Sequence, residues 1–590
     1  MLKPIFLFVF LFITGLMVIA QNKMVMVTYD SLPNGITFEK YNTDRSAVEL
    51  QCQKVVTQLM NKGFLTASVD SIRYWHDTAF VQIYSGKLFQ WGQIRYKYLP
   101  KGMVDQFGFN RSLLGSANID ALQKSMTLTI RHFENLGYPF AYFFWDSLHI
   151  AQDTIHGILH FEKNILITFD TMALYGDPGL SKSFLYNYLN FTPGQKYDER
   201  IVTGMNDKLS RLPFATLQNK PQIYFIDRKA IVVISLKKRK TDRLDGLIGF
   251  APNTGLPGNT KLLVTGEFHL DFKNVRGSGK GFKADWQSFQ ARSQTLNAGL
   301  NLPYLLNQPV GADVSVDFLK YDTLYTETRF NIGLHYLFSG LNNFRLFYEQ
   351  KNTNLQYIDT FAIRQNKKLG DFTAMRTNRY GAELNVNNFD NPLSPRKGYL
   401  SILNASVFKR TILRDERINR VKFYDAQNKS YYTVYDSAKV VSFQMLIQYT
   451  LAKAWLLRKN VVFYNEVKGF HFFSPQIYFN ELYRFGGNNT FRGFNEQSMF
   501  GSSLSIINLE VRYLLSENSF LKVFGNGAYY NDKSDRPGKI SEDFPVGFGG
   551  GINLETAGGI FNISIALGKS KYIPIDFKNA KVHFGLINYF

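Results

Sequence analysis

The sequence of 590 residues is poor in several features that define common protein classes. Its one cysteine, Cys52, permits no intrachain disulfide and no cysteine-based metal cluster. After Gln21 there is no apolar run of 18 residues or more, which argues against a helical membrane span in the mature chain. No G-x-S-x-G motif is present, so a lipase-type nucleophile elbow is absent. We see no catalytic constellation and expect a protein that is not an enzyme.

Acidic residues are scarce beside basic ones, 47 against 68, which gives a formal net charge of +21. The cations are dispersed along the chain, so we do not expect a nucleic-acid partner. Aromatic residues are abundant, with 53 Phe and 34 Tyr, and 45 Gly accompany them. So many large apolar side chains exclude a disordered polyelectrolyte. This composition suits antiparallel strands better than helices.

The first 20 residues resemble a secretory signal. Lys3 precedes an apolar run, Ile5 to Ala20, that ends in small residues. The run is shorter than the roughly 20 residues that cross a bilayer as a helix, so we expect cleavage after Ala20 and not a permanent anchor. No cysteine closes the segment, which argues against a lipid anchor. Cys52 is then an exported thiol that we expect to be buried or inert.

Residues 21 to 240 contain a pattern that repeats about every 75 residues. Helical stretches end at residues 61–64, 135–138 and 211–214, the first two at a Gly, which takes a left-handed backbone conformation easily. Two short strands are predicted after each stretch: 65–74 and 78–84, 141–150 and 154–162, 222–226 and 230–237. In the third repeat we also predict a strand at 165–173 and helices at 181–189 and 199–212. These repeats predict α+β modules at 21–88, whose pattern is incomplete, 89–163 and 164–240.

From residue 241 to 590 the period changes to two. Phe330, Ile332, Leu334, Tyr336 and Phe338 alternate with other residues, as do apolar positions in several further stretches. A soluble sandwich and a membrane barrel both produce such alternation. About 350 residues without helices would make a very large sandwich, whereas a barrel of about 16 antiparallel strands fits this length. We therefore predict a transmembrane β-barrel, with a long outward loop at Arg410 to Tyr432 and a tight turn at Asn274 to Gly281 at the opposite end.

The most specific stretch is a glycine-rich loop, residues 485–494, which contains Phe491, Arg492, Gly493 and Phe494. An arginine inside a polar lumen needs a carboxylate, because its planar guanidinium forms two hydrogen bonds at once. The stretch resembles the (V/I)RG(F/Y) loop of the BamA/TamA-like outer-membrane protein assembly superfamily. The resemblance implies that the loop folds back into the barrel and that Arg492 meets an acidic residue of the wall, for which Glu510 is our candidate. Phe491 replaces the aliphatic residue usual in that family.

Other segments carry the same resemblance. Residues 390–399 resemble a turn and strand start of these barrels, and Phe584, Leu586 and terminal Phe590 resemble the C-terminal strand signal of outer-membrane barrels. The 75-residue repeats resemble POTRA (polypeptide-transport-associated) modules, which precede the bacterial surface antigen barrel in this superfamily.

The resemblance implies an insertase or translocase in the outer membrane, with its modules in the periplasm and no cofactor. Expected partners are unfolded outer-membrane or exported clients, lipid, and periplasmic or lipoprotein accessory factors. Gly246 and Gly249 would weaken the first barrel strand where it meets the last. A two-partner-type secretion pore for one client, and a passive porin or scaffold, stay open as alternatives.

Three further features of the sequence resemble functional motifs but have simpler explanations. His156 and His160 lie four apart, but on a predicted strand, so we expect surface histidines and no metal site. Residues 277–281 contain Gly and Lys, as a phosphate-binding loop does. Their spacing does not match that motif, so we expect a hairpin turn. The basic run at 237–240 lies where modules meet barrel and is either a solvated linker or a contact to anionic headgroups.

Overall fold

The computed structural model describes residues 24–587 except 30, 253–261, 291, 392–393, 426, 428, 488–489, 496, 535–537, 557–558, 572 and 578–579. The predicted signal segment and Phe590 lie outside these residues. No helix in the described part of the chain is long and apolar enough to cross a membrane. The chain forms two compact units: Met1–Phe169 with Gly194–Arg200 and Phe225–Ala230, and Asp170–Pro193 with Ile201–Tyr224 and Ile231–Phe590.

The first small sheet has the order β2-β1-β4-β3, with β1 parallel to β4. Its elements are β1 (Met24–Thr28), β2 (Tyr41–Asn42), α2 (Arg45–Asn61), β3 (Ser68–Trp75) and β4 (Thr78–Tyr84). The Asp44 side chain caps α2 by accepting a hydrogen bond from the Ala47 amide, and Gly63 follows the helix with φ +103°. Cys52 is buried against the sheet, as expected. Among the described residues of this segment, α2 is the helix that packs on the sheet.

The second small sheet has the order β5-β7-β6. Its elements are β5 (Gln90–Lys97), α3 (Lys101–Gln106), α4 (Phe109–Ser112), α5 (Ile119–Glu134), β6 (Tyr142–Ala151) and β7 (Thr154–Glu162). Gly137, with φ +103°, again follows the long helix. His156 and His160 lie on β7 as predicted, but His160 is buried, not at the surface, because it packs beside the rings of Tyr98 and Phe144.

The third small sheet has the order β10-β11-β8, with β9 paired to β11. Its elements are β8 (Thr168–Tyr175), α6 (Lys182–Leu189), α7 (Glu199–Ser210), β9 (Ala215–Leu217), β10 (Gln222–Ile226) and β11 (Lys229–Lys238). Strand β8 begins three residues later than predicted and α7 ends two residues earlier.

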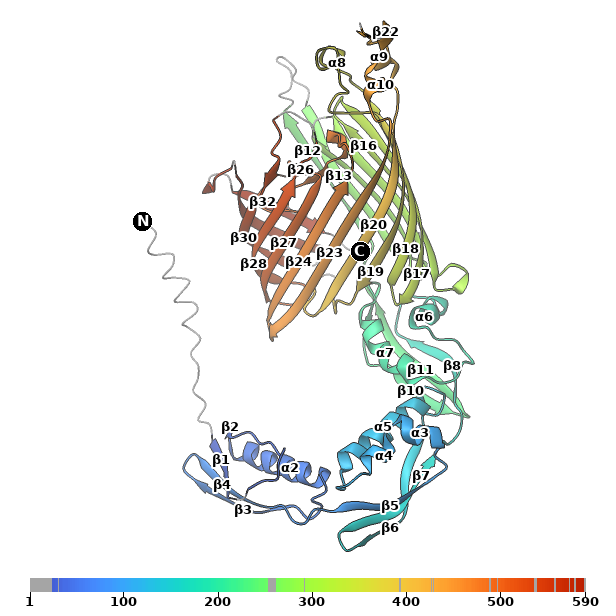
Figure 1. The fold of residues 1–590 in the computed structure, drawn as a ribbon, viewed down its shortest axis with the longest axis vertical. Coiled ribbons are helices and arrows are strands. Elements are labelled where there is room, and N and C mark those ends of the chain that lie inside the picture. The colour runs from blue at the N-terminus through green and yellow to red at the C-terminus, as the bar shows by residue number, and fades with distance from the viewer. Residues whose placement is uncertain are drawn as a thin grey trace. The chain divides into compact units, whose positions relative to one another are not determined.

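The remaining chain forms a sheet of 17 strands that curls into a barrel (Figure 1). Its strand pairs are antiparallel, and β29 and β30 both pair with β28. One strand, β29, has two residues, which leaves 16 longer strands and confirms the predicted number. The strands are β12 (Arg243–Pro252), β13 (Leu262–Val275), β14 (Lys280–Gln290), β15 (Ser293–Leu302), β16 (Val310–Tyr321), β17 (Tyr325–Ser339), β18 (Asn342–Leu355), β19 (Met375–Asn387), β20 (Gly398–Ile412), β23 (Val441–Arg458), β24 (Val461–Phe473), β27 (Ser503–Leu514), β28 (Phe520–Asn531), β29 (Glu542–Asp543), β30 (Val546–Thr556), β31 (Gly559–Lys569) and β32 (Lys581–Ile587).

The barrel wall is apolar outside and polar inside, the reverse of a soluble protein. On β27 the apolar side chains Ile507, Leu509 and Val511 are exposed, whereas Asn508 and Glu510 between them are buried. Strand β17 repeats the pattern, with the five apolar residues predicted from sequence all 41% or more exposed. Such a wall is stable where lipid covers the outside and water or polar groups fill the inside. The fold is a transmembrane β-barrel preceded by small α+β modules.

Tight turns close one end of the barrel. Between β13 and β14 the predicted hairpin turn is present, with Gly277 and Gly279 at positive φ. The Ser181 amide at the start of α6 donates to the Gly277 carbonyl at 2.9 Å, and the Asn274 side chain donates to the Gly179 carbonyl at 2.8 Å. The Arg211 guanidinium donates to Asn388 in the turn between β19 and β20 at 2.8 Å. Helix α6 and the end of α7 therefore contact this end of the barrel.

Long loops at the other end form a packed cap, defined here as residues 356–374 and 413–440 (Figure 1). Its elements are α8 (Thr360–Asn366), α9 (Glu416–Asn419), β21 (Phe423–Asp425), β22 (Ser430–Tyr432) and α10 (Val434–Ser437). Ile363, Ile418, Val421 and Val434 are buried in its core. The outward loop was predicted to start at Arg410, which is wrong: β20 continues to Ile412 because Arg410 is a buried strand residue.

Candidate functional site

The chain between β24 and β27 folds back into the barrel. It contains η2 (Phe479–Glu481), β25 (Tyr483–Phe485) and β26 (Met499–Gly501), and β25 and β26 pair as a hairpin. Phe485, Phe491 and Phe494 are buried in a cluster with residues of β24, β27 and β28. The rings of Phe491 and Phe494 stack with centroids 5.3 Å apart. These rings anchor the loop, which we call the lumen loop (residues 474–502), to the inner wall.

The loop tip lies so close to the last strands that glycine is required on both sides. Gly493 has φ +95°, and a Cβ there would lie 2.6 Å from the Leu567 carbonyl oxygen. A Cβ on Gly547 of β30 would lie 2.2 Å from the Arg492 carbonyl oxygen, and one on Gly568 would lie 2.5 Å from that of Gly493. The glycines of β30 and β31 therefore form a recess that admits the tip.

Arg492 lies inside the barrel, where its guanidinium contacts side chains of β27 and β28. Its Nη1 donates to Oε1 of Glu510 at 2.7 Å, and its Nη2 donates to Oδ1 of Asn526 at 2.8 Å. The guanidinium also lies over the ring of Phe524, 3.8 Å from the centroid. Arg492 thus joins the loop to β27 and β28, and its acidic partner is the residue that the sequence suggested.

Glu510 is shared between two cations. Its second oxygen, Oε2, accepts from Nε of Arg512 at 2.8 Å and lies 2.6 Å from Nη2 of the same residue. Glu510 and Arg492 are each 8% exposed at the side chain, so the pair is shielded from bulk water. A polar cavity of about 250 Å³ adjoins the pair, and its lining includes Lys522 and Glu466. The hydroxyl of Tyr464, another lining residue, donates to Oε2 of Glu466 at 3.3 Å.

Two more arginines, which sequence reasoning missed, hold the lumen loop nearer the cap. Arg410 of β20 is fully buried and donates from Nη1 to Oε2 of Glu481 at 2.7 Å. Arg484 of β25 lies 4.2 Å from the ring centroid of Tyr321 and donates to the hydroxyl of Tyr325, on the opposite wall. The loop therefore contacts β16, β17, β20 and β27. Arg410 and Arg484 could have been sought as cations at alternating positions of strand-like segments.

The other predicted site residues lie on the terminal strands of the sheet. Gly246 and Gly249 belong to β12, where they pair with Phe268 and Thr265 of β13. Phe584 and Leu586 belong to β32, opposite Ile563 and Phe561 of β31. Phe590 lies outside the described residues. Among the described strands, β12 pairs only with β13 and β32 only with β31.

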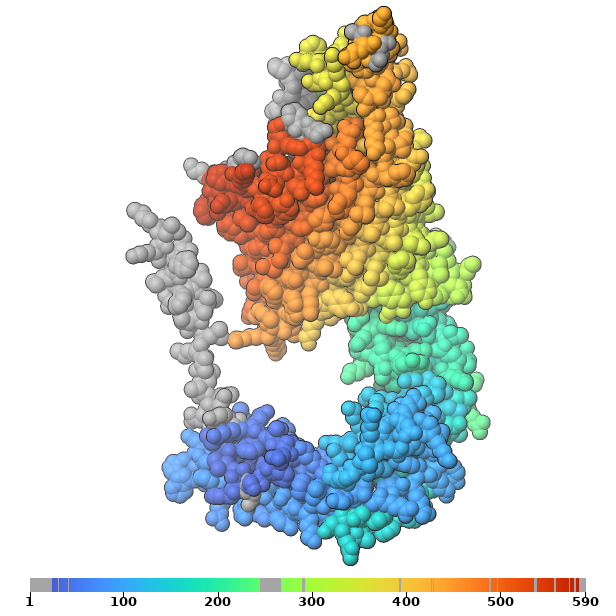
Figure 2. Space-filling view, in the orientation of Figure 1, coloured from blue at the N-terminus to red at the C-terminus, as the bar shows by residue number. Residues whose placement is uncertain are grey.

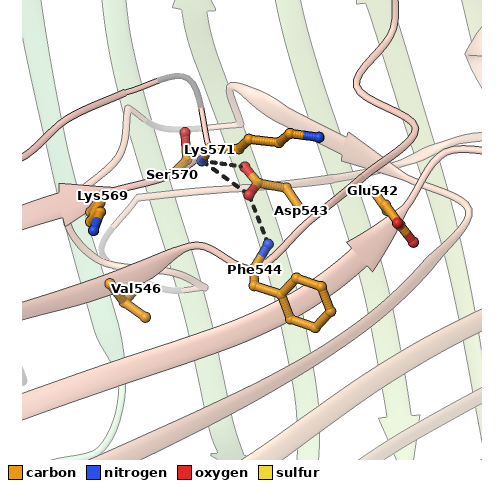
Figure 3. A pocket seen from close by; sticks show the side chains of 7 residues that line it. All are labelled: Glu542, Asp543, Phe544, Val546, Lys569, Ser570 and Lys571. Atoms are coloured by element: carbon orange, nitrogen blue, oxygen red, sulfur yellow. Dashed lines mark hydrogen bonds between the residues drawn. The ribbon is translucent and has the colours of Figure 1, made fainter.

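A hollow of about 480 Å³ lies where β30 begins and β31 ends (Figure 3). Glu542, Phe544, Val546 and Lys569 contribute to its lining. The carboxylate of Asp543 accepts hydrogen bonds from the backbone amides of Phe544 and Lys571, which ties the segment before β30 to the one after β31. Within the ranges the structure covers, no three His, Cys, Asp or Glu side chains gather as a metal site.

Comparison with known proteins shows the family. Residues 274–589, more than half of the chain, match the model of the Omp85 superfamily domain. No curated protein matches the chain. Among solved structures, CdiB from Escherichia coli matches with a TM-score of 0.52 and 14% identity, covering 92% of this chain and 98% of that one.

Two other solved structures are similar at lower scores. CdiB from Acinetobacter baumannii has a TM-score of 0.48 and 12% identity, over 86% of this chain and 90% of that one. BamA from Haemophilus ducreyi lacking POTRA domains 1–3 has a TM-score of 0.43 and 13% identity, over 85% of this chain and all of that one. With the family match to the barrel and the tip loop held inside it, the chain belongs to the Omp85 superfamily.

Proposed function

We propose that the protein is an outer-membrane insertase or translocase that helps client proteins assemble or cross without nucleotide hydrolysis. The observation that carries the proposal is the sheet itself: β12 and β32 each have one described strand partner in an Omp85 barrel. The modules would lie in the periplasm, since the third small sheet leads directly into β12.

The edge strands of the small sheets are suited to capture clients. Strands β3, β6 and β10 each end the order of their sheet, so one side of each strand is without a partner in that sheet. On β6 the side chains of Tyr142, Leu148 and Ile150 are exposed. An extended client segment can add to such an edge through backbone hydrogen bonds, while its alternate side chains pack on the exposed apolar residues.

The seam between β12 and β32 is where the client would enter the membrane. An unpaired backbone group costs several kcal/mol in hydrocarbon, so a strand edge facing lipid favours any arriving strand. Gly246 and Gly249 bring no side chain to pack across β12, which lowers the stability of that strand. Exchange of hydrogen bonds would drive assembly, so no nucleotide or cofactor is needed.

Arg492 would hold the lumen loop in the position that shapes the lumen beside the last strands. Its support is geometric: the tip lies within the recess formed by Gly547 and Gly568, close to the seam. A purely stabilising role for Arg492 is the competing interpretation, and the Arg492→Ala variant distinguishes the two roles.

A two-partner-type secretion pore for one client is the alternative. That class usually carries two modules and a helix that plugs the barrel from the N-terminal side. Here three small sheets precede the barrel, and residues 24–44 as far as described contain no helix. Both observations favour the assembly role.

Depletion of the protein in its host, followed by a proteome of the outer membrane, tests the proposal. We expect a broad loss of barrel proteins. Loss of one exported protein would instead support the secretion pore, and an unchanged proteome would support a porin or scaffold. A second test uses purified full-length protein in liposomes, where an unfolded barrel client should fold faster than in empty liposomes.

A further inference from the structure

A cavity of about 680 Å³ lies where the chain passes from the third small sheet into the barrel. Most of its lining comes from three segments: the residues just before α6, the linker between β11 and β12, and the tight turn between β13 and β14. In Figure 2 the teal surface around α6 adjoins the barrel directly. The Ser181 amide donates to the Gly277 carbonyl at 2.9 Å, and this bond joins the first segment to the turn. The Lys238 amide donates to the Asp177 carbonyl at 2.6 Å, which joins the linker to the first segment. We call this space the junction cavity.

Three cations line the junction cavity: Lys238, Arg239 and Arg276. The stem of Lys238 runs along Gly179, where an added Cβ would lie 3.0 Å from the Lys238 Cγ. Arg239 is half-buried and donates from Nε to the Thr216 hydroxyl at 3.2 Å. Arg276 is exposed in the turn. In the described part of the chain none of these three side chains forms an ion pair, so their charges are open to a ligand.

The lining of the junction cavity has an excess of positive charge. Asp242 contributes one negative charge to it and accepts a hydrogen bond from the Lys273 amide at 3.0 Å. One carboxylate does not balance three cations. The N-terminal end of α6 also lies at the cavity, because its N-cap residue Ser181 is part of the lining, and a helix N-terminus carries a partial positive charge. The cavity therefore favours an anion.

Apolar side chains in the same lining indicate which kind of anion fits. Phe272 lies on β13 four residues after Phe268, so both side chains face the same side of that strand. This is the outer, lipid-facing side of the barrel, since Phe268 is 43% exposed and the residues that alternate with it are polar. Phe272 and the exposed Val275 both line the junction cavity. The cavity therefore joins a basic site to the membrane-facing wall, an arrangement that suits the phosphate and the acyl chains of a lipid.

We propose that the junction cavity binds the headgroup of an anionic phospholipid in the membrane leaflet on the module side. The lipid phosphate pairs with Lys238, Arg239 and Arg276, since ammonium and guanidinium groups form charge-assisted hydrogen bonds to phosphate oxygens. The acyl chains lie against Phe272 and Val275. The bound lipid connects the third module to the barrel at the base of β12. This inference goes beyond the proposed insertase function and does not depend on it, because it requires only that the barrel lies in a membrane.

Native mass spectrometry of the full-length protein, released from detergent micelles, tests the inference by counting bound lipid. Dioctanoyl phosphatidylglycerol is the anionic probe, and dioctanoyl phosphatidylcholine is the control with equal chains and no net charge. The anionic lipid should bind more tightly, by about fivefold or more. Lys238→Gln with Arg276→Gln should weaken its binding by about fivefold for each cation removed. Glycerol phosphate, which has the anion without the acyl chains, should not displace it at equal concentration.

The matched control is Lys237→Gln with Lys280→Gln, which removes two exposed cations of β11 and β14 that do not line the junction cavity. That variant should bind phosphatidylglycerol like the wild type. Equal weakening in the two double variants would show attraction by general surface charge and would overturn the site, as would equal binding of the two lipids. Displacement by glycerol phosphate would show a site for free anions and overturn the assignment to lipid. Client folding in liposomes tests the insertase proposal separately.

Discussion

At the scale of single residues, the Arg492–Glu510 pair is central. Glu510 retains Arg512 when Arg492 is removed, so the buried carboxylate keeps one cation. The loss is then mainly the hydrogen bonds to charged groups and the contact with Phe524, about 2–3 kcal/mol of stability. A barrel with 16 long strands stays folded after such a loss. The loop tip, in contrast, depends on these contacts for its position.

We therefore predict that Arg492→Ala lowers the rate of client folding more than it lowers the amount of folded barrel in the membrane. Quantitative blots of outer membranes and the liposome assay measure the two. Arg492→Lys should restore little of the client-folding rate, because an ammonium group cannot bond Glu510 and Asn526 with the geometry of a guanidinium. If abundance and client folding fall together, Arg492 has only a structural role.

The glycine recess gives a second prediction at this scale. Gly547→Ala places a Cβ against the Arg492 carbonyl oxygen, so the tip must move, and overpacking of this kind costs about 1–3 kcal/mol. Gly550→Ala, in the same strand, brings its Cβ only to 3.6 Å from the nearest oxygen. Protease cleavage within the lumen loop should increase for Gly547→Ala and not for Gly550→Ala. Equal cleavage of both variants would show that the recess does not hold the tip.

The sequence pointed to Glu510 through the family resemblance, which implies that the arginine of the loop meets an acidic residue of a neighbouring wall strand. It did not point to Asn526, Phe524 or Arg512, since these depend on which residues the register of β27 and β28 brings together. Arg410 was assigned to a loop because a charged residue beside polar neighbours resembles a loop until its partner, Glu481, is known.

At the scale of elements, the end of α5 carries a titratable contact within the first unit. Burial, and then the charge of Glu199, raise the pKa of Glu134 above its usual range. The pKa of such a carboxyl is higher in the folded state than in the unfolded state. Its contribution to stability is therefore fully present below the unfolded-state pKa and is lost as the pH rises through the folded-state pKa. The region around α5 should therefore be less protected at neutral pH than in mild acid.

We predict that Glu134→Gln removes part of this pH dependence, because glutamine mimics the protonated carboxyl. The pH dependence is measured in the full-length protein by amide hydrogen exchange of α5 between pH 4 and 7, corrected for intrinsic exchange rates. Protection of the variant should fall less with rising pH than that of the wild type. Glu162→Gln at the end of β7 is the control and should follow the wild type.

Elements with a strong local signal were predicted closely. Strands β4, β7 and β10 have the predicted bounds, and Gly63 and Gly137 end their helices in the left-handed conformation. Helices α3 and α4 were not predicted, since they are short and their contacts, such as Phe109 on Phe143, come from distant strands. The division of the first 240 residues at 88, 163 and 240 stays a prediction.

At the scale of the whole molecule, the alternation of apolar and polar residues was enough to predict the barrel and its number of long strands. The alternation of apolar and polar residues shows which side chains face outward. The length of the segment then limits the number of strands. Neither shows how the first and last strands meet, because that depends on a contact between residues more than 300 positions apart.

The seam provides the last prediction. Since β12 and β32 each have one described partner, their outward amides should exchange with deuterium faster than those of β20 and β23, which have partners on both sides. Gly246→Val with Gly249→Val should strengthen β12, because β-branched residues favour strands, and should slow both exchange and client folding. Gly525→Val in β28, where a Cβ meets nothing within 4 Å, is the control and should leave both rates unchanged. Slower exchange without slower client folding would show that clients do not enter at the seam.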